Sequence, residues 1–242
     1  MATCSSLAGK EPIRRRKRKW NQRCMATTCL GIFMMQVNCV KDALRGDGSG
    51  FTGRSMRIVL ASTSPRRREL LEREGLEFEV MASPAEELHD ESIPLFELCE
   101  RNAELKARAV QVRDAAVIGA DTLVWLDGVP LGKPKDMEGA REMLRRLSGQ
   151  VHTVCTGVCV VFPGGRVERF HELTEVQFRD FDEALIDDYF SRVNPLDKAG
   201  AYGIQEHGEM LVDEIAGSFD NVMGLPVALL LARLGACGTA KG

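Results

Sequence analysis

The sequence has 242 residues, of which 44% are hydrophobic and 28% are charged, and its formal net charge at pH 7 is −3. This length can bury one sizeable core, or one domain with an extension. The charge is unevenly distributed, because residues 1–55 carry a surplus of +8 and residues 56–242 therefore carry −11. An acidic body argues against general binding to nucleic acid backbones, which requires a basic face.

Residues 1–55 differ in composition from the rest of the chain. They contain a basic run at 14–19, an uncharged stretch at 25–40 and a glycine-rich joint at 46–50. The uncharged stretch is too polar for a secretory core and too polar and short for a membrane-spanning helix. Three interpretations stay open: a disordered tail or a start upstream of the natural Met56, a mitochondrial or plastid presequence, and a nuclear or surface-binding basic patch.

The first predicted elements are a buried strand at 58–61, where β-branched residues occur in an apolar run, and a helix directly after it. Ser64 is a good N-cap residue, Pro65 suits the first helical position, and Gly75 marks the end. The chain is therefore expected to form a strand, a tight turn and a helix.

The arginines at 66–68 lie in the first turn of this helix. Free backbone N–H groups and the positive end of the helix dipole make cations unfavourable there. A phosphorylated ligand would relieve the repulsion by accepting hydrogen bonds from the N–H groups, the serine hydroxyls and the guanidinium groups. The alternative is a solvated basic helix start.

Strands and helices continue to alternate along the chain. In chain order, the sequence predicts a short strand at 78–81, a turn at 83–87, a helix at about 95–112, a buried strand at 117–120 that ends on Asp121, a hairpin turn at 127–128, a helix at 140–147, two long strands at 151–162 and 166–178, a helix at about 182–191, a glycine-interrupted loop at 194–208 and a last helix at about 225–235. The two long strands are expected to pair in antiparallel fashion. This mixture favours an α/β fold on one mixed sheet.

Two features concern the interior. The helix at about 95–112 is expected to bury Leu98, Leu105 and Ala109. Cys155 and Cys159 lie four residues apart and therefore on one face of a predicted strand. Buried free thiols in a reducing compartment are expected here rather than a metal site.

Asp121 is the best candidate for the centre of an active site. A carboxylate just past the carboxyl end of a buried strand lies where ligands bind in open α/β sheets. It could hold a divalent cation or take a proton from an attacking water. The alternative is a loop or helix-capping aspartate. Glu86 and Glu87 are a second source of carboxylates, although paired glutamates are usually solvated.

Other polar residues point to ligand binding less directly. Lys106 lies beside the apolar side of its helix, so it must extend to solvent or meet an anion. Lys133 and Lys198, taken singly, are expected to be solvated surface lysines. Gln205 follows a run of small residues and offers both a donor and an acceptor, as base recognition requires. The four histidines fit no triad or metal spacing, and neither a Walker nor a dinucleotide motif occurs.

Taken together, the motifs resemble the Maf family of nucleoside triphosphate pyrophosphatases over nearly all of residues 56–235. The motifs that carry the resemblance, in the family's order, lie at 62–67, 119–122, 132–134, 147–150, 195–205 and 217–226. The resemblance implies that 56–242 form a Maf-like nucleotide pyrophosphatase domain, with 1–55 as an extension. It also implies an elongated mixed sheet flanked by helices, with a cleft between two lobes, as in inosine-triphosphatase-type enzymes.

The resemblance implies hydrolysis of the α–β phosphoanhydride bond to the monophosphate and pyrophosphate, with Mg²⁺ or Mn²⁺ as cofactor. The family's catalytic aspartate corresponds to Asp121, and the metal is expected on Asp121 and Glu87. The family's Ser-x-Arg-Arg start corresponds to Ser64, Arg66 and Arg67, and its phosphate-side lysines correspond to Lys106 and Lys133. The phosphates are expected on Ser64, Arg67, Lys106 and Lys133. In the branch that prefers dTTP and UTP, the pyrimidine is read by residues that match Arg66, Thr122 and Gln205.

Several alternatives accompany this resemblance. A sister branch acts on 7-methyl-GTP, and a catalytically silent nucleotide-binding regulator of cell division would use the same cleft. A third alternative is a nucleic-acid-binding protein that binds through its basic extension. One departure stands beside the expected base pocket, where Glu206 and His207 follow Gln205 although the family commonly has glycine there.

The expected partner is a nucleoside triphosphate, with no stable nucleic acid and no membrane, and a homodimer is left open. The expected location is cytoplasmic.

Overall fold

The computed structural model describes residues 56–90, 92–110 and 112–239, so the interpretations of residues 1–55 lie outside the described part. The strands are β1 (Arg57–Leu60), β2 (Glu79–Val80), β3 (Ala115–Leu126), β4 (Val129–Leu131), β5 (Val151–Val161), β6 (Val167–Phe178) and β7 (Val212–Ala216). The helices are α2 (Pro65–Arg73), α3 (Leu95–Ala109), α4 (Met137–Leu147), α5 (Glu183–Arg192), α6 (Phe219–Met223) and α7 (Val227–Thr239), with short 3₁₀ turns η1 (Ala199–Ala201) and η2 (Gly208–Met210).

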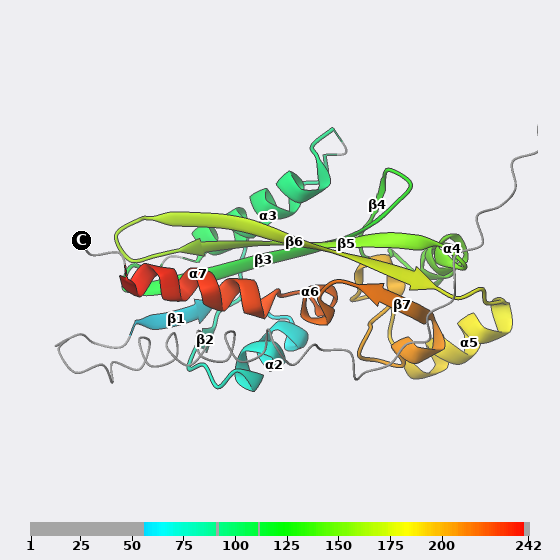
Figure 1. Ribbon diagram of the computed structural model, residues 1–242. Coiled ribbons are helices and arrows are strands. Elements are labelled where there is room, and N and C mark those ends of the chain that lie inside the picture. The colour runs from blue at the N-terminus through cyan, green and yellow to red at the C-terminus, as the bar shows by residue number, and fades with distance from the viewer. Residues whose placement is uncertain (1–55, 91, 111, 240–242) are drawn as a thin grey trace, which may run out of the picture.

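All seven strands belong to one mixed sheet in the order β2-β1-β3-β5-β6-β7, and β4 pairs with β3 beside this path. β1 runs parallel to β2 and β3, whereas the other pairs are antiparallel. The predicted mixed α/β sheet and the long antiparallel hairpin are therefore confirmed. Figure 1 shows that the long strands β3, β5 and β6 extend through the whole molecule, with α3 on one face and α2 and α7 on the other.

The two faces of the sheet bury alternate residues, as a strand period of two requires. Ile58 and Leu60 of β1 pack in the larger core, to which α2, α6 and α7 contribute. Val59 and Ala61 pack with Ala103 of α3 in a smaller core on the opposite face. The strand is therefore apolar from Ile58 to Leu60, whereas Arg57 at its start is exposed.

Two glycines allow α3 to lie very close to the sheet. A Cβ atom on Gly119 of β3 would collide with the backbone of Ala103, and one on Gly157 of β5 would collide with the backbone of Cys99. This close approach selects small residues for the buried face of α3. The prediction that Leu105 belongs to this face is wrong, because Leu105 is exposed. The buried residues are Leu98, Cys99, Asn102, Ala103 and Ala107.

The prediction that the third strand ends on Asp121 is also wrong, because β3 continues to Leu126. The reason is its partner β5, which pairs with β3 from Val117 to Trp125 and so stabilises the extended backbone past the aspartate. β1, by contrast, ends at Leu60, whose partner on β3 is Ile118. Asp121 thus lies beyond the end of the parallel part of the sheet while remaining inside its own strand.

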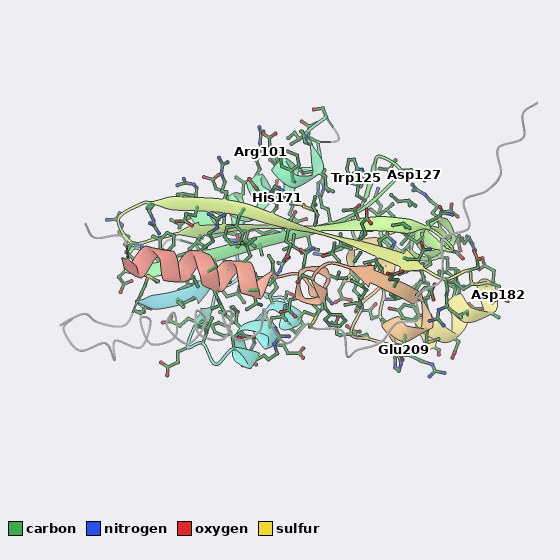
Figure 2. The ribbon with its side chains drawn as sticks, viewed as in Figure 1. Arg101, Trp125, Asp127, His171, Asp182 and Glu209 are labelled. Atoms are coloured by element: carbon green, nitrogen blue, oxygen red, sulfur yellow. The ribbon has the colours of Figure 1, made fainter. Side chains whose placement is uncertain are left out.

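Other boundaries agree more closely. The predicted hairpin turn joins β3 to β4 through Asp127 and Gly128, both at positive φ (50° and 84°) as a type I′ turn requires. Trp125 and Asp127 are labelled on this hairpin in Figure 2. The last helix starts two residues later than predicted and continues to Thr239.

Cys155 and Cys159 of β5 are buried free thiols, as their spacing predicted, and so is Cys99 of α3. Burial raises the pKa of Cys159 to about 12, so this thiol stays protonated at neutral pH. Within the described residues, no helix is both long and apolar enough to span a bilayer.

Candidate active site

A cleft of about 1030 Å³ opens beside the middle of β3. β1 pairs with β3 only as far as Ile118, and β4 starts to pair with it at Val124. Between these two points that edge of β3 pairs with no other described strand. Because ligands in open α/β sheets bind beyond the carboxyl ends of parallel strands, this gap is the expected place for a site.

All nine residues that the sequence nominated line this one cleft: Ser64, Arg66, Arg67, Glu87, Lys106, Asp121, Thr122, Lys133 and Gln205. They come from the start of α2, the loop before α3, α3 itself, the middle of β3, the segment after β4 and the loop before η2. The structure therefore brings together every nominated position, while the role of each remains a prediction.

Asp121 and Thr122 are neighbours on β3, so their side chains point to opposite faces of the sheet. Asp121 lies on the face covered by α3, and Thr122 lies on the face towards α2 and α6. Both nevertheless line the cleft, since the cleft lies at the edge of β3 and reaches around it. One short segment thus supplies a carboxylate and a hydroxyl from two sides.

The carboxylate of Asp121 is almost fully buried, with 5% of the side chain exposed, and each oxygen has a donor. Lys106 donates to Oδ1 at 2.6 Å, and Asn102 donates to Oδ2 at 3.1 Å. Lys106 also lies 2.7 Å from Glu87. Of the two alternatives for Lys106, extending to solvent or meeting an anion, the structure shows the second, because its ammonium group lies between two carboxylates.

Asn102 was missed in the sequence. Besides holding Asp121, its amide accepts from the backbone N–H of Leu88 at 2.7 Å and donates to the Leu88 carbonyl at 3.2 Å. It therefore ties the loop that carries Glu87 to the strand that carries Asp121. The available signal was the helical spacing of Leu98, Asn102 and Lys106, which places an amide in the middle of an apolar stripe.

Arg67 fixes the opposite wall of the cleft. Its guanidinium donates to the Gly224 carbonyl at 2.8 Å, to Ser62 Oγ at 3.2 Å and to Thr122 Oγ1 at 3.1 Å. Thr122 in turn shares a 3.0 Å hydrogen bond with Thr156. Burial lowers the pKa of Arg67 below its ordinary value, and the negative charge of Asp121 acts in the opposite direction.

Arg66 belongs to a closed ring of four charges. Its guanidinium lies 3.1 Å from Asp197 and 3.9 Å from Glu206, and Lys198 lies 2.8 Å from Asp197 and 3.1 Å from Glu206. The ring joins the start of α2 to the loop before η2. Burial alone would raise the pKa of Asp197, but the hydrogen bond from Lys198 and the charges of Lys198 and Arg66 outweigh it and lower the pKa.

This ring corrects two expectations. Lys198 is not a solvated surface lysine, because only 4% of its side chain is exposed. The crowding of arginines is also relieved without a ligand at two positions, since Arg66 pairs with Asp197 and Arg68 pairs with Glu72. In the described part of the chain, only Arg67 of the three has no carboxylate within ion-pair distance.

Gln205 and Ser64 both keep unused polar atoms. Gln205 Oε1 is buried without a hydrogen-bond partner among the described residues, while Nε2 donates to Glu206 at 3.4 Å. Ser64 occupies the N-cap position of α2, as predicted, but its side chain makes no capping hydrogen bond. Its hydroxyl therefore remains available in the cleft.

Lys133 is exposed at the cleft, as is its neighbour Lys135, and no ion pair involves either in the structure as described. The histidines behave as expected of surface or core residues. His152 is buried and bonds Tyr202, while His171, labelled in Figure 2, pairs with Glu100 at 2.6 Å. Sequence reasoning missed that His89 lines the cleft.

The carboxylates fit a small hard cation. No cluster of three or more His, Cys, Asp or Glu side chains suited to a metal is found among the described residues. Mg²⁺, however, is ordinarily bound by one or two carboxylates together with substrate phosphates and water. Asp121 and Glu87 both contact Lys106, so their oxygens are close together, and each carboxylate keeps free lone pairs.

Comparison with known proteins adds independent findings. The sequence model of a family described as "Maf-like protein" matches residues 57–237. A dTTP/UTP pyrophosphatase of Akkermansia muciniphila is 50% identical over 183 residues, which cover 75% of this chain and 96% of that protein. A dTTP/UTP pyrophosphatase of Aquifex aeolicus is 44% identical over 179 residues, with 72% and 92% covered.

Among solved structures, the Ham1 protein of Staphylococcus aureus aligns with 74% of this chain and 98% of its own, at 17% identity and a TM-score of 0.45.

Proposed function

Because the chain belongs to the Maf-like protein family, we propose that it is a nucleoside triphosphate pyrophosphatase that hydrolyses dTTP and UTP to the monophosphate and pyrophosphate. The relatives that bear the name dTTP/UTP pyrophosphatase match the chain over almost their whole length. The family model matches residues 57–237, a range that includes every residue lining the cleft, and this supports assigning the same activity to this chain.

One observation carries the proposal: a buried carboxylate, Asp121, lies at the gap in the sheet with cationic groups around it. Phosphoryl transfer needs charge neutralisation and a positioned water more than a protein nucleophile. The cleft offers Arg67 and Lys133 as cations. In the sequence, no histidine has the spacing expected of the general base that activates a serine or cysteine nucleophile.

In the proposed reaction, a water attacks a phosphorus atom of the α–β bridge, and the bond from that phosphorus to the bridging oxygen breaks. Asp121 accepts the proton of the water. The leaving group takes the electron pair of the broken bond: it is pyrophosphate if the α phosphorus is attacked and the nucleoside monophosphate if the β phosphorus is attacked. Lys106 and Asn102 hold the Asp121 carboxylate in one orientation, which keeps its free lone pairs directed at one place.

The triphosphate would be bound at the start of α2 and by the segment after β4. The first N–H groups of α2, the unused hydroxyl of Ser64 and the guanidinium of Arg67 form one side, and Lys133 forms the other. Lys133 has no competing carboxylate in the described structure, so its charge is available to phosphate.

Asp121 and Glu87 are the residues that would hold Mg²⁺ or Mn²⁺, as the carboxylate pair described above supports. When bound, the cation supplies charge stabilisation to the phosphate oxygens. The base would be read by Arg66, Thr122 and Gln205, of which Gln205 offers an acceptor that the protein itself leaves without a donor.

A cytoplasmic location and a homodimer extend the proposal. The buried free thiols of Cys99, Cys155 and Cys159 support a reducing compartment. Light scattering on the purified protein measures the mass of the assembly, and a monomeric mass would contradict the homodimer.

The proposed function is tested by assaying pyrophosphate release from UTP, dTTP, CTP, GTP and 7-methyl-GTP. We expect the highest kcat/KM for UTP and dTTP. Preferred hydrolysis of 7-methyl-GTP would assign the chain to the sister branch, and binding of nucleotides without release of pyrophosphate would make it a non-catalytic regulator.

A further inference from the structure

The contact between Gln205 and Glu206 restricts how the glutamine amide is oriented. Gln205 Nε2 lies 3.4 Å from Glu206 Oε1. A carboxylate is an acceptor only, whereas the two ends of a glutamine amide are a donor and an acceptor. If the amide were reversed, its oxygen would lie against the carboxylate and the two acceptors would repel each other. The amide therefore has one favourable orientation as long as Glu206 is ionised and in place.

Glu206 is itself held in position by the charge ring. Its second oxygen, Oε2, lies 3.1 Å from the buried ammonium group of Lys198, and Oε1 lies 3.9 Å from Arg66. Lys198 is fixed in turn by the Asn194 carbonyl at 2.8 Å. An ion pair with a buried lysine is difficult to rearrange, because either partner would lose its counter-charge.

The backbone is adapted to this arrangement at Gly203. A Cβ atom there would lie 2.7 Å from Lys198 Cε and 3.4 Å from Glu206 Oε1. A larger residue at 203 would therefore force the Lys198 side chain to move, whereas its Cβ would only touch Glu206. The loop thus accommodates Lys198 and Glu206 against its own backbone, directly beside Gln205.

This orientation leaves Gln205 with an acceptor to satisfy. Oε1 is buried and has no partner in the described structure, which is costly for an amide oxygen. The amide also keeps one N–H that Glu206 does not use. Gln205 lines the cleft, so a ligand is the available partner. Uracil and thymine carry a hydrogen on ring nitrogen N3 next to a carbonyl, which matches an adjacent acceptor and donor. Cytosine has no hydrogen on N3.

We infer that Glu206 is a positioning residue that fixes the amide of Gln205 and makes the site prefer a base with a hydrogen on N3. This inference rests on the proposed function, since it requires that Gln205 contacts the base of a bound nucleotide. Glu206 itself contacts no base; it acts through Gln205. It gives a role to the residue that departs from the glycine common in the family.

The test is the ratio of kcat/KM for UTP to kcat/KM for CTP. Glu206→Gln is isosteric, but its amide can donate or accept, so Gln205 becomes free to turn either way. We expect the ratio to fall about tenfold, chiefly through a lower KM for CTP, which is the effect of about one hydrogen bond. Glu206→Ala, which removes the acceptor altogether, should lower the ratio in the same direction.

Asp197→Asn is the matched control. It removes a charge from the same ring, next to Arg66 and Lys198, without touching Gln205. The ratio of kcat/KM for UTP to kcat/KM for CTP in this variant should stay within about twofold of the wild-type value, even if both kcat/KM values change.

The inference is overturned if the ratio for Glu206→Gln stays within twofold of wild type, or if Asp197→Asn lowers it equally. It is also overturned if the wild-type enzyme hydrolyses UTP and CTP equally well. A wild-type protein that does not hydrolyse UTP at all refutes the proposed function and this inference with it.

Discussion

The ammonium group of Lys106 donates a 2.6 Å hydrogen bond to Asp121, and the two side chains are 13% and 5% exposed. This pair joins α3 to the middle of β3. Because the carboxylate has little access to water, its charge depends on Lys106 for compensation.

Lys106→Met should therefore destabilise the fold by about 3 kcal/mol, since it leaves a buried carboxylate without its cation. Urea unfolding measures this loss. Adding Glu87→Gln to the Lys106→Met variant should restore part of the stability, because Glu87 also approaches Lys106 at 2.7 Å. A single variant as stable as wild type would show that the carboxylate is solvated.

Asp121→Asn should lower kcat by about 10³-fold with the fold intact, as expected when a general base is removed. Pyrophosphate release measures the rate, and circular dichroism checks the fold. Asp127→Asn is the matched control, because Asp127 is exposed in the turn that ends the same strand and asparagine tolerates its positive φ. A loss of less than tenfold in Asp121→Asn would refute the catalytic role.

Arg67→Lys should lower kcat/KM for UTP by about 100-fold, because lysine cannot reproduce the three-way contact with Gly224, Ser62 and Thr122. Arg68→Lys changes the adjacent residue of the same helix, whose guanidinium pairs with Glu72 on the surface. The kcat/KM of Arg68→Lys for UTP should stay within about twofold of the wild-type value. Equal losses in the two variants would mean that general basicity, and not the Arg67 contact, matters.

Gly119→Ala should destabilise the protein by about 3 kcal/mol, because the added methyl would overlap the α3 backbone and push the helix from the sheet. Gly132→Ala meets open space and should leave stability unchanged or slightly higher. Thermal unfolding of both variants gives the comparison. An unaffected Gly119→Ala variant would show that α3 can shift without cost.

His152 should make stability depend on pH below about 6.5. Burial lowers the pKa of His152 to about 3, whereas the unfolded chain binds a proton near 6.5. The stabilisation is therefore present above pH 6.5 and is lost as the pH falls towards 3, by about 1.4 kcal/mol per pH unit.

Urea unfolding between pH 6 and pH 5 measures this slope. His152→Gln should lower this slope by about 1.4 kcal/mol per pH unit, the contribution of one proton. Tyr202→Phe, which removes only the hydrogen bond to His152, should leave the slope unchanged. Equal slopes in His152→Gln and wild type would mean that the folded protein also protonates His152.

The sequence predicted the site more completely than the boundaries around it. Asp121, Lys106 and Arg67 could be nominated because a charged group beside an apolar run, or at a helix start, is unfavourable without a partner. The end of the strand at Asp121 could not be predicted, because pairing with β5 is a long-range effect that is absent from the local pattern.

The missed residues share a physical reason. Asn102 and Lys198 look like ordinary surface residues in the sequence, yet both are buried. Asn102 contacts the distant strand β3, and Lys198 contacts Asn194, Asp197 and Glu206 of its own loop. Asn102 meets β3 across the close approach that Gly119 permits, and Lys198 meets Glu206 beside Gly203. In both cases a glycine at another position creates the space. Helical spacing can place Asn102 on the buried side of α3, but the local sequence does not show which groups either residue contacts.

β3 passes beneath the cleft without interruption and is hydrogen-bonded to β5 along both sides of Asp121. A strand paired in this way cannot act as a hinge, so opening and closing of the cleft must come from the loops around it. The Asp121 carboxylate is consequently set in place when the chain folds. The entropy of arranging it is lost once, during folding, and each arriving nucleotide meets a preorganised centre.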